Sequence, residues 1–280
     1  MHDVIIVGGG LFGSVLARHL YTQGMSVVLV DDHRPERGSD PAGCVIKPSW
    51  VSSMSRTDLD AGLGLLHQYY TVKSVDFQVL PSKLKTTAYR VEPSSILTLT
   101  STSTRFTVVR SRVHSIIDHG PCATVVLPAG PTMTLQARWV VVAAGIWTPE
   151  LCPWVETWGR WGWAFRAMPV YDPVISLWAP YKQVVAFNMD DGMSWAGDGS
   201  ALVEKSFRQP YREQSARQRV ERIVGKTTTT LSGVRPYASL VGRDPCMVSP
   251  RGRVIALTGG AKNGTIAAAW AARKIEGIVT

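Results

Sequence analysis

Three glycines near the start of the chain have the spacing of a loop that binds nucleotide phosphates. Gly8, Gly10 and Gly13 follow the order Gly-x-Gly-x-x-Gly. In such a loop the first glycine permits a tight turn, the second lets the backbone approach a pyrophosphate, and the third packs a helix against a strand. The N-terminus of that helix then faces the phosphates. The spacing therefore predicts binding of a dinucleotide.

The segments around these glycines have the order that a dinucleotide site needs. The apolar stretch Val4–Val7 predicts a strand, and the apolar positions of residues 11–20 predict a helix that closes at Gly24. A second strand is expected at Ser26–Val30. Asp31 follows it, about 20 residues beyond the glycines, where a carboxylate binds a ribose hydroxyl and disfavours a 2′-phosphate. FAD and NAD share this pattern, so these residues alone do not choose between them.

The composition is that of an ordinary globular protein with a substantial core. The 280 residues are 45% hydrophobic and 18% charged, which excludes low-complexity, collagen-like and disordered chains. No apolar run approaches the roughly 20 residues of a membrane-spanning helix, and no basic leader precedes the first apolar stretch. We therefore expect a soluble, cytoplasmic protein without a membrane partner, whose oligomeric state stays open.

The net charge indicates which partners the protein favours, and the cysteine spacing indicates whether it holds a metal or disulfides. Thirty Lys and Arg residues against 21 Asp and Glu residues give a net charge of +9, which favours polyanionic partners through long-range attraction. The cysteines have no CxxC or Cys/His spacing, so we expect buried thiols and neither a metal site nor a disulfide framework. They are Cys44, Cys122, Cys152 and Cys246.

Further segments resemble parts of flavin-dependent oxidases. Residues 137–151 resemble the segment in which a strand of the FAD-binding sheet ends in a small-residue turn against the cofactor. Residues 254–265, followed by the Ala-rich helix expected at 266–275, resemble the C-terminal flavin-binding segment. Ser232–Pro236 resembles the Gly-Leu/Val-Arg-Pro motif of these enzymes, and Ser39–Ile46 more loosely resembles the loop that passes the isoalloxazine ring.

Together these segments resemble the D-amino-acid oxidase superfamily, especially its glycine oxidase and sarcosine oxidase branch. That branch includes the oxidase domain acting on carboxymethylaminomethyl-uridine in tRNA. The resemblance implies an α/β fold, in which a mixed antiparallel-sheet substrate domain is inserted into a Rossmann-like FAD-binding domain. The implied FAD-binding domain comprises residues 1–55, 90–152 and 226–280, and the implied substrate domain comprises 56–89 and 153–225.

The same resemblance implies which residues contact FAD, held without a covalent bond. Cys44 invites a covalent link, but the relatives that attach flavin to cysteine use a position in the C-terminal half. The expected contacts are Gly8, Gly10, Leu11, Phe12, Gly13, Asp31, Asp32, Gly43, Cys44, Ala144, Gly145, Trp147, Gly259, Gly260, Ala261, Lys262, Asn263, Gly264 and Thr265.

Three basic residues are the catalytic candidates that the resemblance implies. Arg235 occupies the place of an arginine that grips the substrate carboxylate, for which a planar guanidinium is well suited; the alternative is a surface Arg beside Pro236. Lys262 is expected near the substrate or the flavin carbonyls, or in solvent. Lys47 would stabilise the superoxide formed during reoxidation, although solvent exposure is its more common role.

The chemistry implied by the family is oxidation of an amine beside a carboxylate. A hydride passes from the carbon next to nitrogen to N5 of the flavin, and water hydrolyses the resulting imine. The flavin performs the difficult step. The protein orients the substrate and binds its carboxylate, so the absence of a catalytic triad carries no information.

Two segments rich in Trp and Arg suggest a larger substrate. Such residues can stack bases and bind phosphates, although core packing and a solvated helix face are their more common roles. The chain is also short for the family, which suggests a trimmed substrate domain and an open site. The first segment contains Trp154, Trp158, Arg160, Trp161, Trp163 and Arg166, and the second contains Arg208, Arg212, Arg217, Arg219 and Arg222.

By analogy with the tRNA-modifying branch, the sequence suggests a glycyl-type secondary amine on a modified pyrimidine in DNA or RNA. Oxidation would release glyoxylate, leave an aminomethyl base and require extrusion of a base held in a duplex. The first alternative is oxidation of a free small amino acid such as glycine, sarcosine or a D-amino acid. The second is a non-catalytic flavoprotein that binds nucleic acid or a partner enzyme. The electron acceptor stays open.

Overall fold

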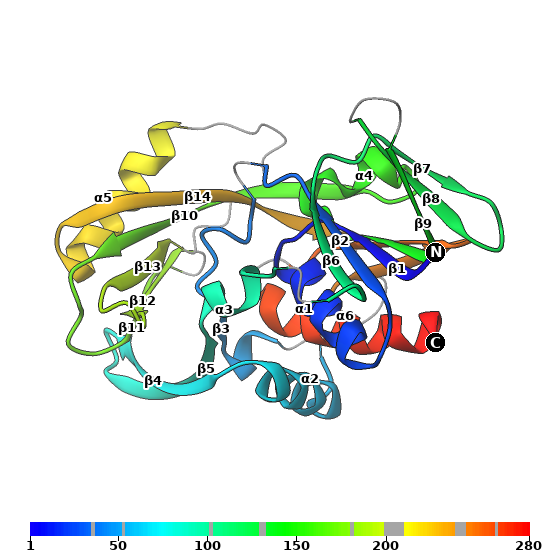
Figure 1. Cartoon of the computed structure of the whole chain (residues 1–280). Helices are drawn as coiled ribbons and strands as arrows, with labels where there is room; N and C mark the ends of the chain where they lie inside the picture. Colours follow the sequence, from blue (N-terminus) through cyan, green and yellow to red (C-terminus); the bar gives the residue numbers. More distant parts are fainter. Residues whose placement is uncertain are drawn as a thin grey trace.

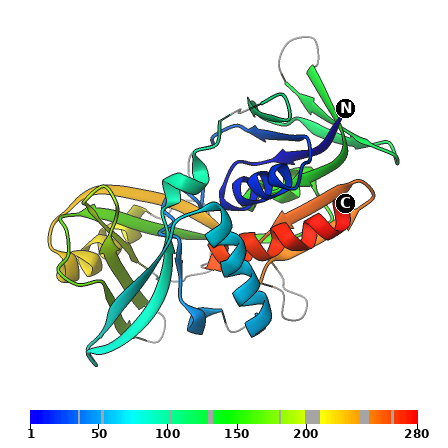
Figure 2. The ribbon, with the colours of Figure 1, turned by 60° about the horizontal axis from the view of Figure 1, so that its bottom comes forward.

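Two sheets, each with eight strands among the described residues, form the framework of the molecule, and the chain passes between them several times (Figure 1). The termini lie on the side of the first sheet, and the second sheet extends away from them (Figures 1 and 2). The computed structural model describes residues 1–34, 37–51, 54–100, 103–128, 133–179, 182–198, 210–238, 245–260 and 263–280.

The first sheet contains the strand–turn–helix–strand unit of the N-terminus. β1 (His2–Val7) pairs in parallel with β2 (Val27–Asp31) on one side and with β9 (Met133–Val142) on the other. β6 (Phe106–Arg110) continues the parallel sheet beyond β2, and β16 (Val254–Thr258) continues it beyond β9. The carboxyl ends of these strands therefore meet at one edge, where open α/β sheets bind ligands.

Helices cover one face of this sheet and a meander covers the other. α1 (Leu11–Thr22) packs against α6 (Gly264–Val279), which also packs against α2 (Arg56–Tyr69) (Figure 2). On the opposite face, β7 (Ser115–Asp118) and β8 (Ala123–Leu127) form an antiparallel meander with β9. Side chains of β1 alternate between the two resulting cores, because successive residues of a strand point to opposite faces.

The second sheet is almost entirely antiparallel. Only β11 and β4 pair in parallel among its described strands. In spatial order it contains β14 (Thr227–Ala238), β10 (Thr157–Ala167), β13 (Ser194–Asp198), β12 (Lys182–Asn188), β11 (Val174–Ala179), β4 (Val72–Leu80), β5 (Leu84–Val91) and β3 (Val45–Ile46).

Helix α5 (Pro210–Val224) packs on one face of the second sheet, where Ala216 and Val220 meet β10, β12 and β13. The opposite face carries a separate cluster that includes Phe187 and Trp195. The remaining elements are β15 (Met247–Arg251), which pairs antiparallel with β16, and the short helices η1 (Pro48–Trp50), α3 (Pro93–Leu97), η2 (Gly145–Trp147) and α4 (Thr148–Leu151).

The predicted fold class is confirmed, because a Rossmann-like parallel sheet is joined to a mixed second sheet. The antiparallel meander runs from β7 to β9, with a turn at His119 to Pro121 between β7 and β8. The domain boundaries stay a prediction. The stretch 226–280, predicted as part of the FAD-binding domain, contains β14, which belongs to the second sheet. Among the described residues, no helix is long and apolar enough to cross a membrane.

Candidate FAD and substrate site

The glycine loop makes two close backbone contacts that exclude side chains. Gly8 has φ +104°, and a Cβ atom there would lie 2.5 Å from the carbonyl oxygen of Ala143 at the end of β9. A Cβ atom at Gly13 would lie 1.8 Å from the carbonyl oxygen of Gly8. Both glycines are therefore required by the space between β1, α1 and β9, as the spacing predicted.

The N-terminus of α1 opens next to this loop. Gly10 is its N-cap residue, and the backbone N–H of Leu11 donates a hydrogen bond to the hydroxyl of Ser39 at 2.9 Å. Ser39 belongs to the loop that follows β2, so it connects that loop to the helix N-terminus. The first N–H groups of a helix favour negative charge. Ser39 thus lies where the pyrophosphate is expected.

Asp31 is the most densely contacted carboxylate near the loop. Its Oδ1 accepts a hydrogen bond from the N–H of Gly9 at 2.9 Å, and its Oδ2 lies 2.8 Å from His33 Nδ1. Nη1 of both Arg37 and Arg110 lies 3.1 Å from the same Oδ2. Burial alone would raise the pKa of Asp31, but the N–H of Gly9, then His33 and Arg37, outweigh burial and lower it. The carboxylate is therefore ionised and already partnered.

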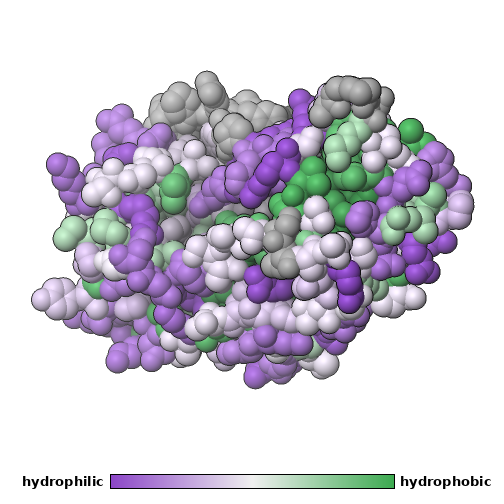
Figure 3. Space-filling model, in the orientation of Figure 1, coloured by the Kyte–Doolittle hydropathy of each residue, from purple (hydrophilic) through white to green (hydrophobic). Residues whose placement is uncertain are grey.

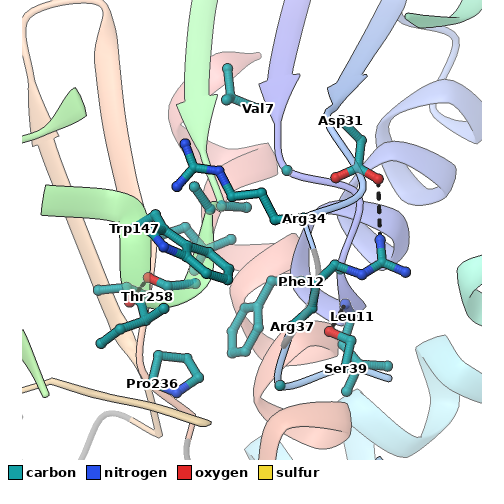
Figure 4. Close-up of a pocket in the computed structure, with 18 of the residues that line it drawn as sticks. Val7, Leu11, Phe12, Asp31, Arg34, Arg37, Ser39, Trp147, Pro236 and Thr258 are labelled. Atoms are coloured by element: carbon teal, nitrogen blue, oxygen red, sulfur yellow. Dashed lines mark hydrogen bonds and ion pairs between the residues drawn. The ribbon is translucent and has the colours of Figure 1, made fainter. Parts of the chain in front are cut away.

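A large cavity connects Asp31 to the second sheet. Its empty volume is about 1040 Å³, counting space open to solvent. In Figure 3, hydrophobic residues gather in a hollow where Figure 1 places α4, β2 and β6. In Figure 4, Asp31 and Arg37 lie opposite Trp147, Thr258 and Pro236. Predicted residues that line the cavity are Gly8, Gly10, Leu11, Phe12, Asp31, Asp32, Ala144, Gly145, Trp147, Arg235, Gly259 and Gly264.

Other predicted residues do not line this cavity. Gly260 faces Phe12, since an added Cβ would lie 2.6 Å from Cζ of that ring. Burial raises the pKa of Cys44 to about 12, and Cys44 is hydrogen-bonded to Thr265. Burial also lowers the pKa of Lys47. The predicted site residues that do not line the cavity are Gly13, Gly43, Cys44, Lys47, Gly260, Asn263 and Thr265. Ala261 and Lys262 lie outside the described residues.

Sequence reasoning missed several residues of the cavity wall. The Arg34 guanidinium lies 5.0 Å from the centroid of the Trp147 ring and forms ion pairs with Asp32 at 2.7 Å and Glu150 at 3.2 Å. Thr258 donates a hydrogen bond to the carbonyl of Gly145 at 3.0 Å, which joins the end of β16 to the start of η2. The only sequence signal for Arg34 was its place just after the second strand.

Trp195 was also missed, although it holds the loop that follows Ser39. Its Nε1 donates a hydrogen bond to the carbonyl of Pro41 at 3.1 Å, and its ring stacks on Phe187. Added Cβ atoms at Gly43 and Gly197 would lie 3.0 Å and 2.2 Å from the ring. Trp195 therefore fixes residues 41–43 against the second sheet, and no sequence pattern marks this contact.

The residues present fit a bound dinucleotide. One cavity contains the ionised carboxylate of Asp31, the glycine loop with the N-terminus of α1, and Arg235. The contacts at Gly8 and Gly13 leave room only for backbone, as the tight turn and the close packing of the helix against the strand require. These features suit the ribose, the phosphates and an anionic group beyond them.

The comparison with protein families decides which dinucleotide this is. Residues 3–67 match a family model described as FAD dependent oxidoreductase. The chain is a FAD-dependent oxidoreductase. The predictions of FAD and of this enzyme class are confirmed, whereas the glycine oxidase and sarcosine oxidase branch stays a prediction. A comparison of this oxidoreductase with curated protein sequences finds no match.

Solved structures share the fold of this oxidoreductase at low sequence identity. Iminodiacetate oxidase from Chelativorans sp. BNC1 is 15% identical with a TM-score of 0.69, over 99% of this chain and 95% of that chain. Glycine oxidase from Geobacillus kaustophilus is 14% identical with a TM-score of 0.71, over 99% and 94%. L-alpha-glycerophosphate oxidase from Mycoplasma pneumoniae, solved with FAD bound, is 15% identical with a TM-score of 0.76, over 99% and 94%.

Proposed function

We propose that this oxidoreductase oxidises the CH–NH group of a small amino acid or N-substituted glycine, whose carboxylate binds Arg235. The observation that carries the proposal is that Arg235 lines the same cavity as Gly8, Gly10 and Asp31. A guanidinium presents paired N–H donors that match a carboxylate. An arginine beside a flavin cavity is therefore suited to an anionic substrate.

The proposed reaction divides the work between cofactor and protein. FAD, when bound, accepts the electron pair and hydrogen from the substrate C–H bond. Arg235 would bind the carboxylate and orient that bond, and Pro236 limits the backbone freedom of the arginine. Water then hydrolyses the oxidised substrate to a 2-oxo acid and an amine, so the atoms balance with one water consumed.

The neighbouring folds support an amine substrate. Iminodiacetate oxidase and glycine oxidase are named for compounds in which an amine lies next to a carboxylated carbon. L-alpha-glycerophosphate oxidase is named for an anion that carries alcohols and no amine. A CH–OH donor with an anionic group is therefore the second candidate, and Arg235 suits that anion as well.

The findings favour a small substrate over a modified pyrimidine in nucleic acid, because most of the described Trp and Arg side chains that suggested nucleic acid have partners inside the protein. Trp163 is 5% exposed in the core beneath α5. Arg166 pairs with Asp191, Arg217 lies over the Phe165 ring, and Arg219 pairs with buried Asp198. Trp158 is 38% exposed. Arg208 and the side chains of Arg160 and Arg212 lie outside the described residues.

The catalytic roles of Lys47 and Lys262 remain predictions from the sequence. Lys47 is not among the residues that line the cavity, and its part in reoxidation stays a prediction. Lys262 is outside the described residues. The non-catalytic alternative, a flavoprotein that binds nucleic acid or another enzyme, predicts no flavin reduction by any amine.

Anaerobic reduction of the flavin tests the proposal directly. The FAD-loaded protein is mixed with glycine, sarcosine, iminodiacetate, glycerol 3-phosphate or an oligonucleotide carrying a glycyl-modified pyrimidine. Loss of the oxidised flavin absorbance with one of the three amino acids is the expected result. Reduction only by glycerol 3-phosphate would establish the alcohol donor, reduction only by the oligonucleotide would restore the nucleic-acid substrate, and no reduction would favour the non-catalytic flavoprotein.

A charge-removing variant tests the assigned role of Arg235. Arg235→Leu is expected to lower kcat/KM roughly a hundredfold, because hydrogen bonds to charged groups contribute about 1.5–3 kcal/mol each. FAD should still bind. Arg56→Leu on α2 removes the same charge from a side chain that is 86% exposed and should leave kcat/KM unchanged. Equal kinetics for Arg235→Leu and the wild type would contradict the carboxylate assignment.

A further inference from the structure

Arg235 lies across its neighbouring strand, over a glycine. In the β10–β14 ladder, Arg235 is opposite Arg160 and Gly233 is opposite Gly162. A Cβ atom added to Gly162 would lie 2.8 Å from Cζ, Nε and Nη2 of Arg235. Three atoms of the guanidinium group are thus equally close to the missing Cβ position. The guanidinium group therefore lies flat on the backbone at Gly162, in space that any other residue would fill.

The backbone itself does not require glycine at this position. Gly8 and Gly259, by contrast, have φ values of +104° and +94°, which side chains rarely adopt, whereas the φ of Gly162 lies outside that left-handed region. Alanine at 162 would therefore fit the strand conformation. What excludes it is the space taken by the guanidinium of Arg235.

The residues around Gly162 limit where the Arg235 guanidinium could move if the space over Gly162 were filled. On the same face of the ladder, the loop after β2 covers Gly233, since an added Cβ there would lie 2.2 Å from the carbonyl oxygen of Arg37 and 3.0 Å from Cδ of Pro41. Gly38 of that loop in turn packs against the carbonyl of Val234. The loop after β2 therefore fills the space over Gly233, whereas the space over Gly162 is left for the guanidinium of Arg235.

We propose that Gly162 is a positioning residue that sets where the Arg235 guanidinium meets the substrate carboxylate. The inference rests on the proposed function, in which Arg235 binds that carboxylate. A methyl group at 162 would push the guanidinium by roughly 1 Å to reach normal van der Waals distance. The displaced atoms are the end of a flexible side chain, so the fold tolerates the change while the carboxylate loses its matched partner.

The test uses the FAD-loaded protein and a small carboxylate, glycolate, whose binding is followed by the flavin absorbance change. Gly162→Ala is expected to raise the Kd of glycolate roughly tenfold, with the melting temperature and the FAD affinity close to those of the wild type. Gly162→Val should raise it further, because a larger side chain fills more of the space. Gly64→Ala on α2, where no atom lies within 4 Å of the added Cβ, is the matched control.

A double-mutant cycle separates this role from a general distortion of β10. In the Arg235→Ala protein the methyl group of Gly162→Ala has room, so the second substitution should not weaken glycolate binding further. A tenfold loss in both backgrounds, or no loss in the wild-type background, would overturn the role of Gly162. If Arg235→Ala alone leaves glycolate binding unchanged, the assignment of the carboxylate to Arg235 fails, and the role of Gly162 fails with it.

Discussion

The backbone N–H of Gly9 donates a hydrogen bond of 2.9 Å to the Asp31 carboxylate. This contact connects the glycine turn after β1 with the end of β2, two points separated by 22 residues. The second carboxylate oxygen is shared by His33, Arg37 and Arg110. A ribose hydroxyl must therefore join a charge network that the protein has already assembled.

The first prediction concerns the pH dependence of stability at Asp31. Burial would raise its pKa, but the N–H of Gly9, His33 and Arg37 reverse this and hold the pKa below the ordinary value. A lowered folded-state pKa contributes stability that is present above the unfolded value, about 4, and is lost as pH falls through the folded value. Between about pH 5 and 3 the wild type should lose more unfolding free energy than Asp31→Asn, as measured by urea titration. Parallel pH curves would contradict this.

The second prediction concerns close packing in the glycine turn. Gly13→Ala would place a methyl group 1.8 Å from the carbonyl oxygen of Gly8, and a backbone atom cannot move aside cheaply. We expect a loss of about 1–3 kcal/mol in unfolding free energy and a weakened flavin absorbance after purification. Exposed Gly64→Ala, in the middle of α2, should instead gain about 1 kcal/mol. Full flavin content in Gly13→Ala would show that the turn can relax.

The third prediction concerns the attachment of α5 to the second sheet. Asp198 on β13 is fully buried and forms an ion pair with Arg219 of α5. Arg219→Met leaves a buried carboxylate without this partner and is expected to cost about 3 kcal/mol. The exposed pair of Arg56 and Asp60 is the comparison, and Arg56→Met should cost less than about 1 kcal/mol. Urea unfolding measures both, and similar losses would argue against a special role for burial.

The fourth prediction concerns thiol reactivity. Burial raises the pKa of Cys44 and of Cys152 to about 12, so neither forms a thiolate near neutral pH. Cys122 is only partly buried. Iodoacetamide at about pH 8 should label Cys122 first in the folded protein, and all four cysteines after unfolding, as read by mass spectrometry. Early labelling of Cys44 would contradict the buried thiol.

The fifth prediction concerns the attachment of the cofactor. With Cys44 buried and protonated, FAD is expected to be held without a covalent bond. Acid precipitation should leave all flavin in the supernatant and none on the protein, measured by absorbance and by the intact mass of the chain. Flavin that stays with the precipitate would require a covalent link elsewhere.

The sequence by itself determined the N-terminal unit of this protein. The spacing of Gly8, Gly10 and Gly13 and the acid at the end of the second strand predicted β1, α1, β2 and the place of Asp31 at the end of β2. These features depend on consecutive residues, because a tight turn, a helix start and a strand end are local backbone requirements. The resemblance of four segments then predicted the fold class and FAD.

Only the tertiary structure decided what surrounds those residues. Arg235 and Gly162 are 73 residues apart, and their contact depends on the register of β10 against β14, which no local pattern encodes. The packing of the Trp195 ring against Gly43 likewise requires separate segments to meet. The arginines that suggested nucleic acid likewise show what the sequence leaves open. The composition gives their total charge, but whether Arg219 faces solvent or the buried Asp198 depends on how α5 packs on its sheet.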